Sequence, residues 1–566
     1  MILPAAVIGT AIAGLAPCSC PALFDMAIAR VEETYIGYRL EVDSAARPAY
    51  EARKAAAHRR AAAPGADCLA VLRQWVDGFQ DGHLFILYSP SFTPAELDSL
   101  ARTAVHTDWT TARLREALRD PARLDRIEGF WYAKDDAYRV GIVRDPEDPS
   151  SFLAVVVSST VEGWKEGELK ARFRKAPDGR YTAVYRMADQ STRRLPVWLS
   201  RGALLEMPGG VAWGKESPIP GWQRGMLDPE DPLAPTLRRT TDGTLVVSVP
   251  SHDGRYRSVL DSLVARNRAR LLAARLLVVD LRGDVGGGSM TTAPLMPFIY
   301  ARPERRPPGP RGTAVVLASP ENLAYFSRWK GEGDGPPWLR DLLARMGRNL
   351  GEIVDFQVRP DTVEAWAPDT IYDRPDRVAI LTDHRVASAG EAFLLFALHS
   401  PRVTTFGERT WGMIDYQSVS VIPVGCPGSG LYLGYPTIAA SRRLPVGGLN
   451  RTGIAPDVPL DLEHGDPIEK ILAYYRTRSS GQPSPIPDAD SAASGPGSSA
   501  PIRSQSRAQA SSPSSSRRTR KNSLGAWKSS SAVEKEKNRV RSPMCRSNSS
   551  EIGTVLPTRT SRGSTP

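Results

Sequence analysis

The spacing of apolar residues changes along this chain and divides it into regions of different structure. Residues 23–126 carry Ala, Leu, Arg and Glu at helical spacing, which predicts a small helical domain. Short alternating runs such as 139–143 and 152–157, separated by turn residues, predict β-strands between residues 129 and 213. From Thr236 onward, apolar strands alternate with helical stretches, a pattern typical of an α/β domain.

Two buried strands of the predicted α/β domain end in runs of small residues. The strand 276–281 is followed by the glycine-rich stretch 282–289 and by a helix expected from Met290. The strand 378–381 leads through a short turn to a helix expected over 391–398. Ligands of such domains meet the carboxyl ends of the strands, so these two turns are where we expect chemistry.

Ser388 lies in the second of these turns, beside Ala387, Ala389 and Gly390. A serine at a helix N-terminus has an uncrowded hydroxyl, lies beside unpaired backbone N–H groups and feels the positive end of the helix dipole. This position suits a nucleophile, but serine is also a preferred helix cap, and this stretch alone favours the cap. Val386 excludes a lipase-type Gly-x-Ser-x-Gly elbow.

The glycine-rich stretch from Gly283 to Gly288 follows a strand, as nucleotide-binding loops do. Its Gly-x-x-Gly-Gly-Gly spacing differs from the dinucleotide fingerprint, and no Gly-Lys-Ser/Thr ending makes it a phosphate loop. Its backbone N–H groups can approach a substrate oxygen without interference from side chains. The alternative is a tight strand-to-helix turn with no chemical role.

The N-terminal residues predict export. Residues 1–16 are apolar, too short for a membrane span, and end in small residues, as an export signal cleaved near Ala16 would. The signal lacks a basic residue before its apolar run. Cys18, Cys20 and Cys68 suit a disulfide in an oxidising compartment, periplasmic or extracellular.

The C-terminal region, residues 479–566, is rich in Ser, Pro and Arg and is predicted to be disordered. It holds +9 of the net charge of +11, which leaves +2 for the rest of the chain. Most of the excess positive charge therefore lies in the C-terminal region, and it gives no support for specific nucleic-acid binding by the folded part. No zinc-ligand spacing occurs either, so no metal or other cofactor is expected.

Four short motifs occur in the order, and at about the spacing, of one known family. They are Leu277–Gly288, Ala387–Glu391, Gly407–Gly412 and Gly453–Asp457. The chain thereby resembles the core of the C-terminal-processing and tricorn-type serine peptidases, and within them the tricorn-like branch. The resemblance implies an α/β fold with a crotonase-like core, a superhelical stack of strand–strand–helix units.

The resemblance also implies roles for particular residues. Ser388 would be the nucleophile, and the N–H groups of Gly286 and Ala389 would hold the oxyanion. The lysine of the processing branch is replaced by Met413. The tricorn-like branch instead takes a histidine from the end of a helix in the N-terminal region, and His83 matches that setting as the general base.

Asn450 stands where the tricorn-like branch has a glutamate as the third catalytic residue. An asparagine oxygen can still orient an imidazole, but it lacks the charge that stabilises an imidazolium. Asp81, two residues before His83, is the alternative orienter and ranks below Asn450.

These observations predict an exported serine peptidase that cleaves peptides or unfolded proteins through an acyl-enzyme. The alternatives are a non-catalytic or weakly active binding protein on the same fold, and an esterase-type hydrolase. No membrane span is expected, and the oligomeric state stays open. The expected regions are a signal peptide at 1–16, a helical domain at 17–126, a β-rich domain at 127–235, a catalytic core at 236–478 and a disordered tail at 479–566.

Overall fold

The computed structural model describes residues 18–480 except 220, 303–312, 332, 334, 357–367 and 369. The predicted signal peptide, residues 1–16, lies outside the described residues. Residues 481–566 of the predicted disordered tail lie outside them as well. None of the helices in the described part of the chain is long and apolar enough to cross a membrane.

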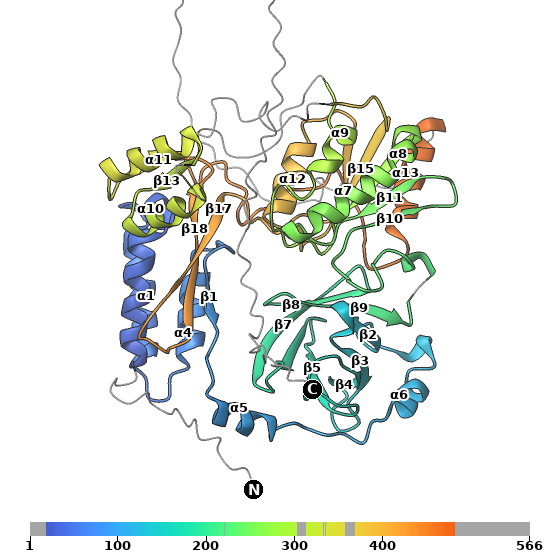
Figure 1. Ribbon diagram of the computed structural model, residues 1–566, viewed down its shortest axis with the longest axis horizontal. Helices are drawn as coiled ribbons and strands as arrows, with labels where there is room; N and C mark the ends of the chain where they lie inside the picture. Colours follow the sequence, from blue (N-terminus) through green and yellow to red (C-terminus); the bar gives the residue numbers. More distant parts are fainter. Residues whose placement is uncertain are drawn as a thin grey trace, which may run out of the picture. The chain divides into compact units, whose positions relative to one another are not determined.

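The N-terminal region is helical, as its apolar spacing predicts (Figure 1). Its main helices are α1 (Cys20–Thr34), α2 (Ile36–Glu41), α3 (Arg47–Ala61) and α4 (Cys68–Asp77), followed by α5 (Pro94–Ala101) and α6 (Thr111–Ala117). Phe24 and Trp75 pack edge to face in their common core, with ring centroids 5.4 Å apart. Asp67 caps α4 by accepting a hydrogen bond from the backbone N–H of Ala70.

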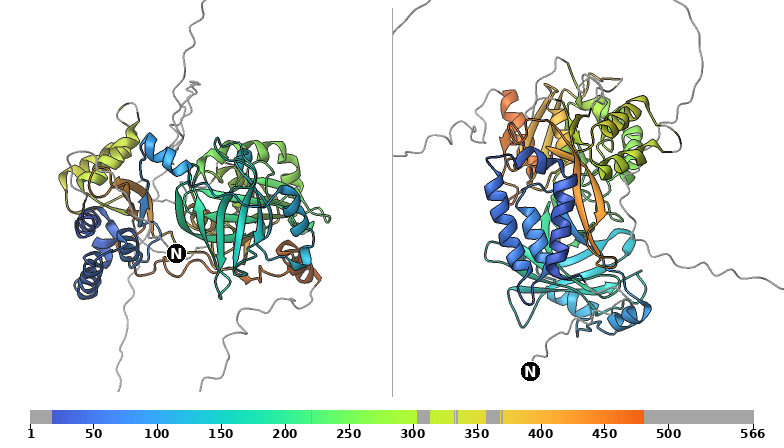
Figure 2. Two further views of the ribbon diagram at one scale, coloured as in Figure 1. Left: turned by 90° about the horizontal axis from the view of Figure 1, so that it is seen from below. Right: turned by 90° about the vertical axis from the view of Figure 1, so that its left-hand side faces the viewer.

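The predicted β-rich region is a closed eight-stranded barrel, coloured teal in Figure 2. Its strands are β2 (Gly129–Ala133), β3 (Arg139–Arg144), β4 (Ser151–Ser158), β5 (Leu169–Lys175), β6 (Tyr181–Arg186), β7 (Thr192–Ser200), β8 (Leu204–Met207) and β9 (Val211–Ser217). Aromatic side chains fill the interior, among them Trp131, Phe173 and Trp213. The alternation of buried and exposed residues along β6 is the strand pattern read from the sequence.

A six-stranded sheet forms the centre of the predicted α/β region. Its strands run in the order β10 (Thr236–Arg239), β11 (Leu245–Ser248), β12 (Leu276–Asp280), β15 (Arg377–Thr382), β16 (Val403–Gly407) and β19 (Val458–Pro459). All neighbours are parallel except β10 and β11. The carboxyl ends of β12 and β15 therefore meet at one edge of the sheet and bring the two small-residue turns together.

Helices cover both faces of this sheet (Figure 1). One face packs against α7 (Arg257–Arg266), α8 (Arg268–Ala273), α9 (Met296–Ile299) and α12 (Ala389–Ala397). The other face packs against α13 (Pro467–Ser480) through Ile468 and Ile471. The strands are apolar on both sides because both faces are covered, which explains their continuous apolar runs.

Two helices begin or divide differently from the prediction. The helix expected from Met290 is absent; a 3₁₀ turn at Ala293–Leu295 and the short α9 come later, each with a proline in its first turn. The apolar spacing of residues 256–275 predicts a single helix, but the structure divides it at Asn267 into α7 and α8, because Asn267 has non-helical backbone angles.

A second, five-stranded antiparallel sheet carries the N-terminal strand. Its long strand β18 (Leu431–Ala439) pairs with β1 (Phe85–Tyr88), β13 (Val315–Leu317) and β17 (Tyr416–Pro423), and β13 pairs with β14 (Ile353–Asp355). Helices α10 (Pro320–Ser327) and α11 (Pro337–Arg348) pack on it. The pairing of β1 with β18 brings the segment just before β1, which contains His83, to the C-terminal half of the chain.

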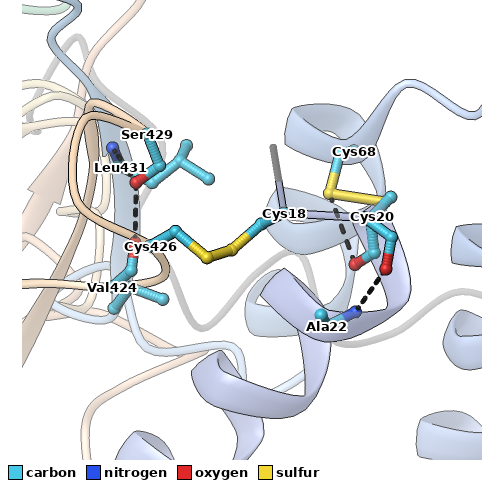
Figure 3. Close-up of a disulfide and its surroundings, with 9 residues drawn as sticks. Cys18, Cys20, Ala22, Cys68, Val424, Cys426, Ser429 and Leu431 are labelled. Atoms are coloured by element: carbon cyan, nitrogen blue, oxygen red, sulfur yellow. Dashed lines mark hydrogen bonds between the residues drawn. A yellow bond between two sulfur atoms is a disulfide. The ribbon is translucent and has the colours of Figure 1, made fainter. Parts of the chain in front are cut away.

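Two disulfides tie the start of α1 to other parts of the chain (Figure 3). Cys20 pairs with Cys68, with Cα atoms 5.4 Å apart. Cys18 pairs with Cys426, in the hairpin between β17 and β18, with Cα atoms 6.0 Å apart. The prediction considered only Cys18, Cys20 and Cys68, and a partner 408 residues away could not be read from the sequence.

Candidate active site

The structure brings His83 and Ser388 into contact. The Nε2 atom of His83 lies 2.9 Å from the Oγ atom of Ser388. Ser388 is half-buried at the start of α12, and the His83 residue is 7% exposed in the turn between α4 and β1. A base within hydrogen-bond distance of a hydroxyl can accept its proton, so this pair has the geometry of a nucleophile and its general base.

Ser388 has a strained backbone. Its φ of 52° and ψ of −115° lie where non-glycine residues are rarely found. The backbone N–H of Ser388 donates to the carboxylate of Glu391 at 3.2 Å, and this carboxylate also accepts from the N–H groups of Gly412 and Met413 at 2.8 and 2.7 Å. Such strain persists only where the surroundings hold it, and it is concentrated at functional sites.

Asp81 lies on the far side of the imidazole from Ser388. Its Oδ1 atom is 3.9 Å from the Nδ1 atom of His83 and accepts the backbone N–H of His83 at 3.0 Å. Its Oδ2 atom accepts the hydroxyl of Tyr35 at 2.8 Å. No hydrogen bond of ordinary geometry reaches the buried Nδ1 atom of His83 within the described residues.

Burial shifts the two titrating groups in opposite directions. Burial raises the pKa of Asp81 to about 7, although hydrogen bonds from His83 and Tyr35 oppose the shift. Burial lowers the pKa of His83 to about 4, and the backbone of Tyr416 opposes this shift. The imidazole is therefore neutral at pH 7, which is the form that can accept a proton.

The structure places Asn450 differently from the prediction. Its Oδ1 atom accepts the backbone N–H groups of Ile414 and Asp415 at 2.9 and 3.0 Å. Its Nδ2 atom points to Asp81 Oδ1 at 3.5 Å, and no hydrogen bond in the described part of the chain joins it to His83. The expected direct contact with the imidazole is thus absent, because two backbone groups occupy the oxygen that would make it.

Gly286 lies directly against Ser388. A Cβ atom added to Gly286, whose φ is +99°, would come within 2.7 Å of Ser388 Cβ and 3.0 Å of the Ala389 nitrogen. Ala389 is the first residue of α12, so its N–H precedes the hydrogen-bond ladder of that helix. The backbones of Gly286 and Ala389 therefore flank the serine.

The N–H of Gly286 is not free, however. It donates to Asp284 Oδ1 at 3.0 Å, and this atom also accepts the backbone N–H of His252 at 3.1 Å. The other oxygen of Asp284 is hydrogen-bonded to Nδ1 of His252, whose Nε2 atom lies 3.1 Å from Thr292 Oγ1. His252 and Asp284 are fully buried and brace the glycine turn, a partnership that the sequence analysis missed.

The match to a known family falls on the C-terminal half of this site. Residues 341–460 match the model of peptidase family S41. This match covers 120 of the 566 residues of the chain. The matched residues include Ser388, Met413 and Asn450. His83 and Gly286 lie outside the match, so their assignment depends on the geometry above.

Several solved structures show weaker similarity to the chain. No curated protein matches this chain. Among solved structures, mature CPAF in complex with lactacystin is 12% identical over 78% of this chain and 94% of its own, with a TM-score of 0.36. The photosystem II D1 C-terminal processing protease is 14% identical over 79% of this chain and 94% of its own, with a TM-score of 0.31. The tricorn protease is 12% identical over 84% of this chain and 36% of its own, with a TM-score of 0.30.

No group of three or more His, Cys, Asp or Glu side chains that could hold a metal ion occurs in the part of the chain that the structure describes. Tyr35, which donates to Asp81, is a site residue that sequence analysis did not find. It follows α1, 46 positions before Asp81, and no motif marks it.

Proposed function

We propose that this chain is an S41 peptidase that cleaves peptide bonds with Ser388 as nucleophile and His83 as general base. The observation that carries the proposal is the 2.9 Å contact between Nε2 of His83 and Oγ of Ser388, at a strained serine within the S41 region. His83 takes the proton of Oγ as the oxygen attacks the scissile carbonyl carbon. The imidazolium then gives that proton to the leaving amine, and water releases the acyl group by the reverse proton path.

Asp81 is our candidate for the residue that orients and stabilises protonated His83. It lies 3.9 Å from Nδ1, whereas Asn450 makes no hydrogen bond to the imidazole and points to Asp81 instead. An ionised Asp81 stabilises the imidazolium that forms as the serine loses its proton. Asn450 then acts as a positioning residue for Asp81, and this changes the ranking made from the sequence.

The N–H groups of Ala389 and Gly286 are our candidates for the oxyanion hole. Both flank Ser388, and the first N–H of a helix is favourably placed for developing negative charge. The Gly286 N–H donates to Asp284, so it has to break this hydrogen bond before it can donate to the substrate oxygen.

Export and the crotonase-like arrangement are part of the same proposal. The two disulfides support export to an oxidising compartment, periplasmic or extracellular, because disulfides seldom persist in a reducing compartment. Strands β11, β12, β15 and β16 are parallel neighbours in the sheet, and helices lie between them along the chain. This arrangement supports a crotonase-like core.

A fluorophosphonate probe, which labels activated serines, tests the assignment. The wild-type chain should be labelled, and Ser388→Ala and His83→Ala should lose labelling and the cleavage of a denatured protein. His464→Ala removes an exposed histidine and serves as the matched control. Equal labelling of Ser388→Ala and wild type would refute Ser388 as the nucleophile.

One observation favours the alternative of a non-catalytic binding protein on the same fold. The Gly286 N–H is already bound by Asp284, so only one of the two oxyanion donors is available in this arrangement. A folded wild-type protein that neither reacts with the probe nor cleaves peptides or small esters, but retains a bound peptide, would support this alternative. Cleavage of small esters without peptides would support an esterase.

A further inference from the structure

A buried arginine beside the candidate active site lacks acceptors for part of its guanidinium group. Arg385 lies three residues before Ser388, in the turn between β15 and α12, and is 4% exposed. Its Nε and Nη1 atoms are buried and have no hydrogen-bond partner in the described part of the chain. A buried charged group whose hydrogen bonds are unmade is costly, which indicates that a ligand completes this site.

Two tryptophans form the walls around this guanidinium. Its carbon lies 3.9 Å from the ring centroid of Trp198, on β7 of the barrel, and 4.7 Å from that of Trp411. Trp411 is 41% exposed, and its backbone N–H donates to Val386 O at 2.9 Å, two residues before Ser388. Stacking on aromatic rings fixes the orientation of the guanidinium plane. The N–H groups lie in this plane and point outward from its edge, where they can still donate hydrogen bonds.

Carboxylates of the protein itself do not complete the site. Among the described residues, Arg385 forms no ion pair within 4.0 Å; Glu206 and Asp383 act on it from farther away. The Asp383 carboxylate accepts backbone N–H groups of Gly283 and Arg385. Burial raises the pKa of Glu206 to about 8, so this group is largely protonated at pH 7 and provides little compensating charge.

The Trp198 wall is fixed to the catalytic core. Arg201, in the turn after β7, donates through Nη1 to Asp280 Oδ2 at 3.0 Å and to Ser248 Oγ at 2.5 Å. Its Nη2 atom donates to the carbonyl of Asp280 at 3.0 Å, and the whole network is buried. Asp280 ends β12, the strand that leads into the glycine turn. This buried network fixes the end of β7 to β12 and so holds Trp198 beside Arg385.

We propose that Arg385 binds a carboxylate of the peptide substrate, close to the bond that Ser388 attacks. This inference rests on the proposed peptidase function and names a substrate class for it. A carboxylate is planar and offers two acceptor oxygens, which matches the fork of a guanidinium better than a neutral amide does. The Trp411 ring, which is 41% exposed, lies against the guanidinium.

The carboxylate has two possible sources, an Asp or Glu side chain and the C-terminal carboxylate of the substrate. Two pools of random decapeptides distinguish them, one with free C-termini and one with amidated C-termini. Wild type and Arg385→Gln digest both pools, and mass spectrometry identifies the cleaved sequences. Enrichment of Asp or Glu in both pools assigns the side chain, and cleavage confined to the free-acid pool assigns the C-terminus.

The decisive quantity is a ratio of kcat/KM values measured within one protein. For a peptide cleaved in the pools, the carboxylate form is compared with its isosteric amide. We expect wild type to prefer the carboxylate by about 10- to 100-fold, as for a hydrogen-bonded charged group, and Arg385→Gln to bring the ratio to about 1. Partial loss of folded enzyme changes both values equally and leaves the ratio unaffected.

Arg194→Gln is the matched control, because Arg194 is exposed on the same strand as Trp198. It should keep the wild-type ratio. A wild-type ratio of about 1, or a preference that survives in Arg385→Gln, overturns the carboxylate site while fluorophosphonate labelling of Ser388 leaves the peptidase function standing. A wild-type protein without labelling or cleavage overturns both.

Discussion

The side chain of Met413 lies directly against the backbone of Gly82. A Cβ atom added to Gly82 would come within 2.6 Å of the Met413 sulfur. Gly82 immediately precedes His83, and the sequence resemblance aligns Met413 with the lysine of the C-terminal-processing peptidases. The methionine therefore fills the space beside the turn that presents the imidazole.

Gly82→Ala should reduce activity by displacing His83. A displacement of about 1 Å in a catalytic group can cost about 100-fold, so we expect kcat/KM to fall by about 10- to 100-fold. Met413→Ala in the same chain should restore part of the loss, which a double-mutant cycle of kcat/KM measures. Gly347→Ala, in open space on α11, is the control and should change nothing. An unaffected Gly82→Ala enzyme would contradict the positioning argument.

Asp81→Asn should lower activity and raise stability at alkaline pH. Loss of the carboxylate removes stabilisation of the imidazolium, and we expect kcat to fall by about 10²- to 10⁴-fold. The wild-type rate should also rise as pH increases through about 7, where Asp81 ionises, and the variant should lose this dependence.

The stability effect of Asp81 follows from its raised pKa. Between about pH 4 and pH 7 the folded state binds more protons at Asp81 than the unfolded state, so its contribution becomes less favourable as pH rises. Thermal unfolding should therefore show Asp81→Asn to be more stable than wild type at pH 8, with the advantage lost at pH 4. Asp98→Asn, at an exposed site on α5, is the control. A variant less stable than wild type at pH 8 would contradict the shift.

Lys170 should make the stability of the barrel depend on pH. Its ammonium is buried 3.7, 4.1 and 4.7 Å from the ring centroids of Tyr138, Trp164 and Tyr185. Burial lowers its pKa to about 7, so between pH 7 and about 10 the unfolded state binds more protons and stability rises with pH.

The lysine-to-methionine variant isolates this effect. Relative to wild type, Lys170→Met should gain stability on the order of a few kcal/mol at pH 6, and the difference should shrink toward pH 10. Urea unfolding followed by tryptophan fluorescence measures it, with the exposed Lys165→Met as control. A difference that does not change with pH would rule out Lys170 as its source.

Arg201→Met should weaken the attachment of the barrel to the core. Burial alone would raise the pKa of Asp280, but Arg201 and Arg282 hold it at about 2. Removal of one partner from a buried ion pair typically costs about 3–5 kcal/mol, which denaturant unfolding can measure. Arg180→Met, at an exposed ion pair, should cost less than about 1 kcal/mol. Equal losses in the two variants would show that burial of the pair is unimportant.

Local sequence patterns predicted much of the fold. The strands β12 and β15 and the β-rich region from residue 129 follow from apolar periodicity and turn residues. Closure of the β-strands into a barrel could not be predicted, because strand pairing depends on contacts between distant residues. The same reason explains why the partner of Cys18 was missed.

The candidate site could be assembled from motifs, but its partners could not. Motif order suggested Ser388, Gly286 and His83, and their roles stay predictions. The motif position of Asn450 predicted a direct contact with His83. In the folded chain, the side-chain oxygen of Asn450 instead accepts hydrogen bonds from two backbone N–H groups. The pairing of His252 with Asp284 and the stacking of Arg385 between tryptophans depend on packing that no sequence spacing encodes.

The pairing of β1 with β18 determines when His83 can reach Ser388 during synthesis. His83 precedes Ser388 by 305 residues, and β18, which holds β1 in place, is made only after Ser388. A growing chain therefore cannot hold His83 against Ser388 through this pairing until residue 439 has left the ribosome, since contacts of such long range form late. Fragments that stop before β18 should therefore lack the contact between His83 and Ser388.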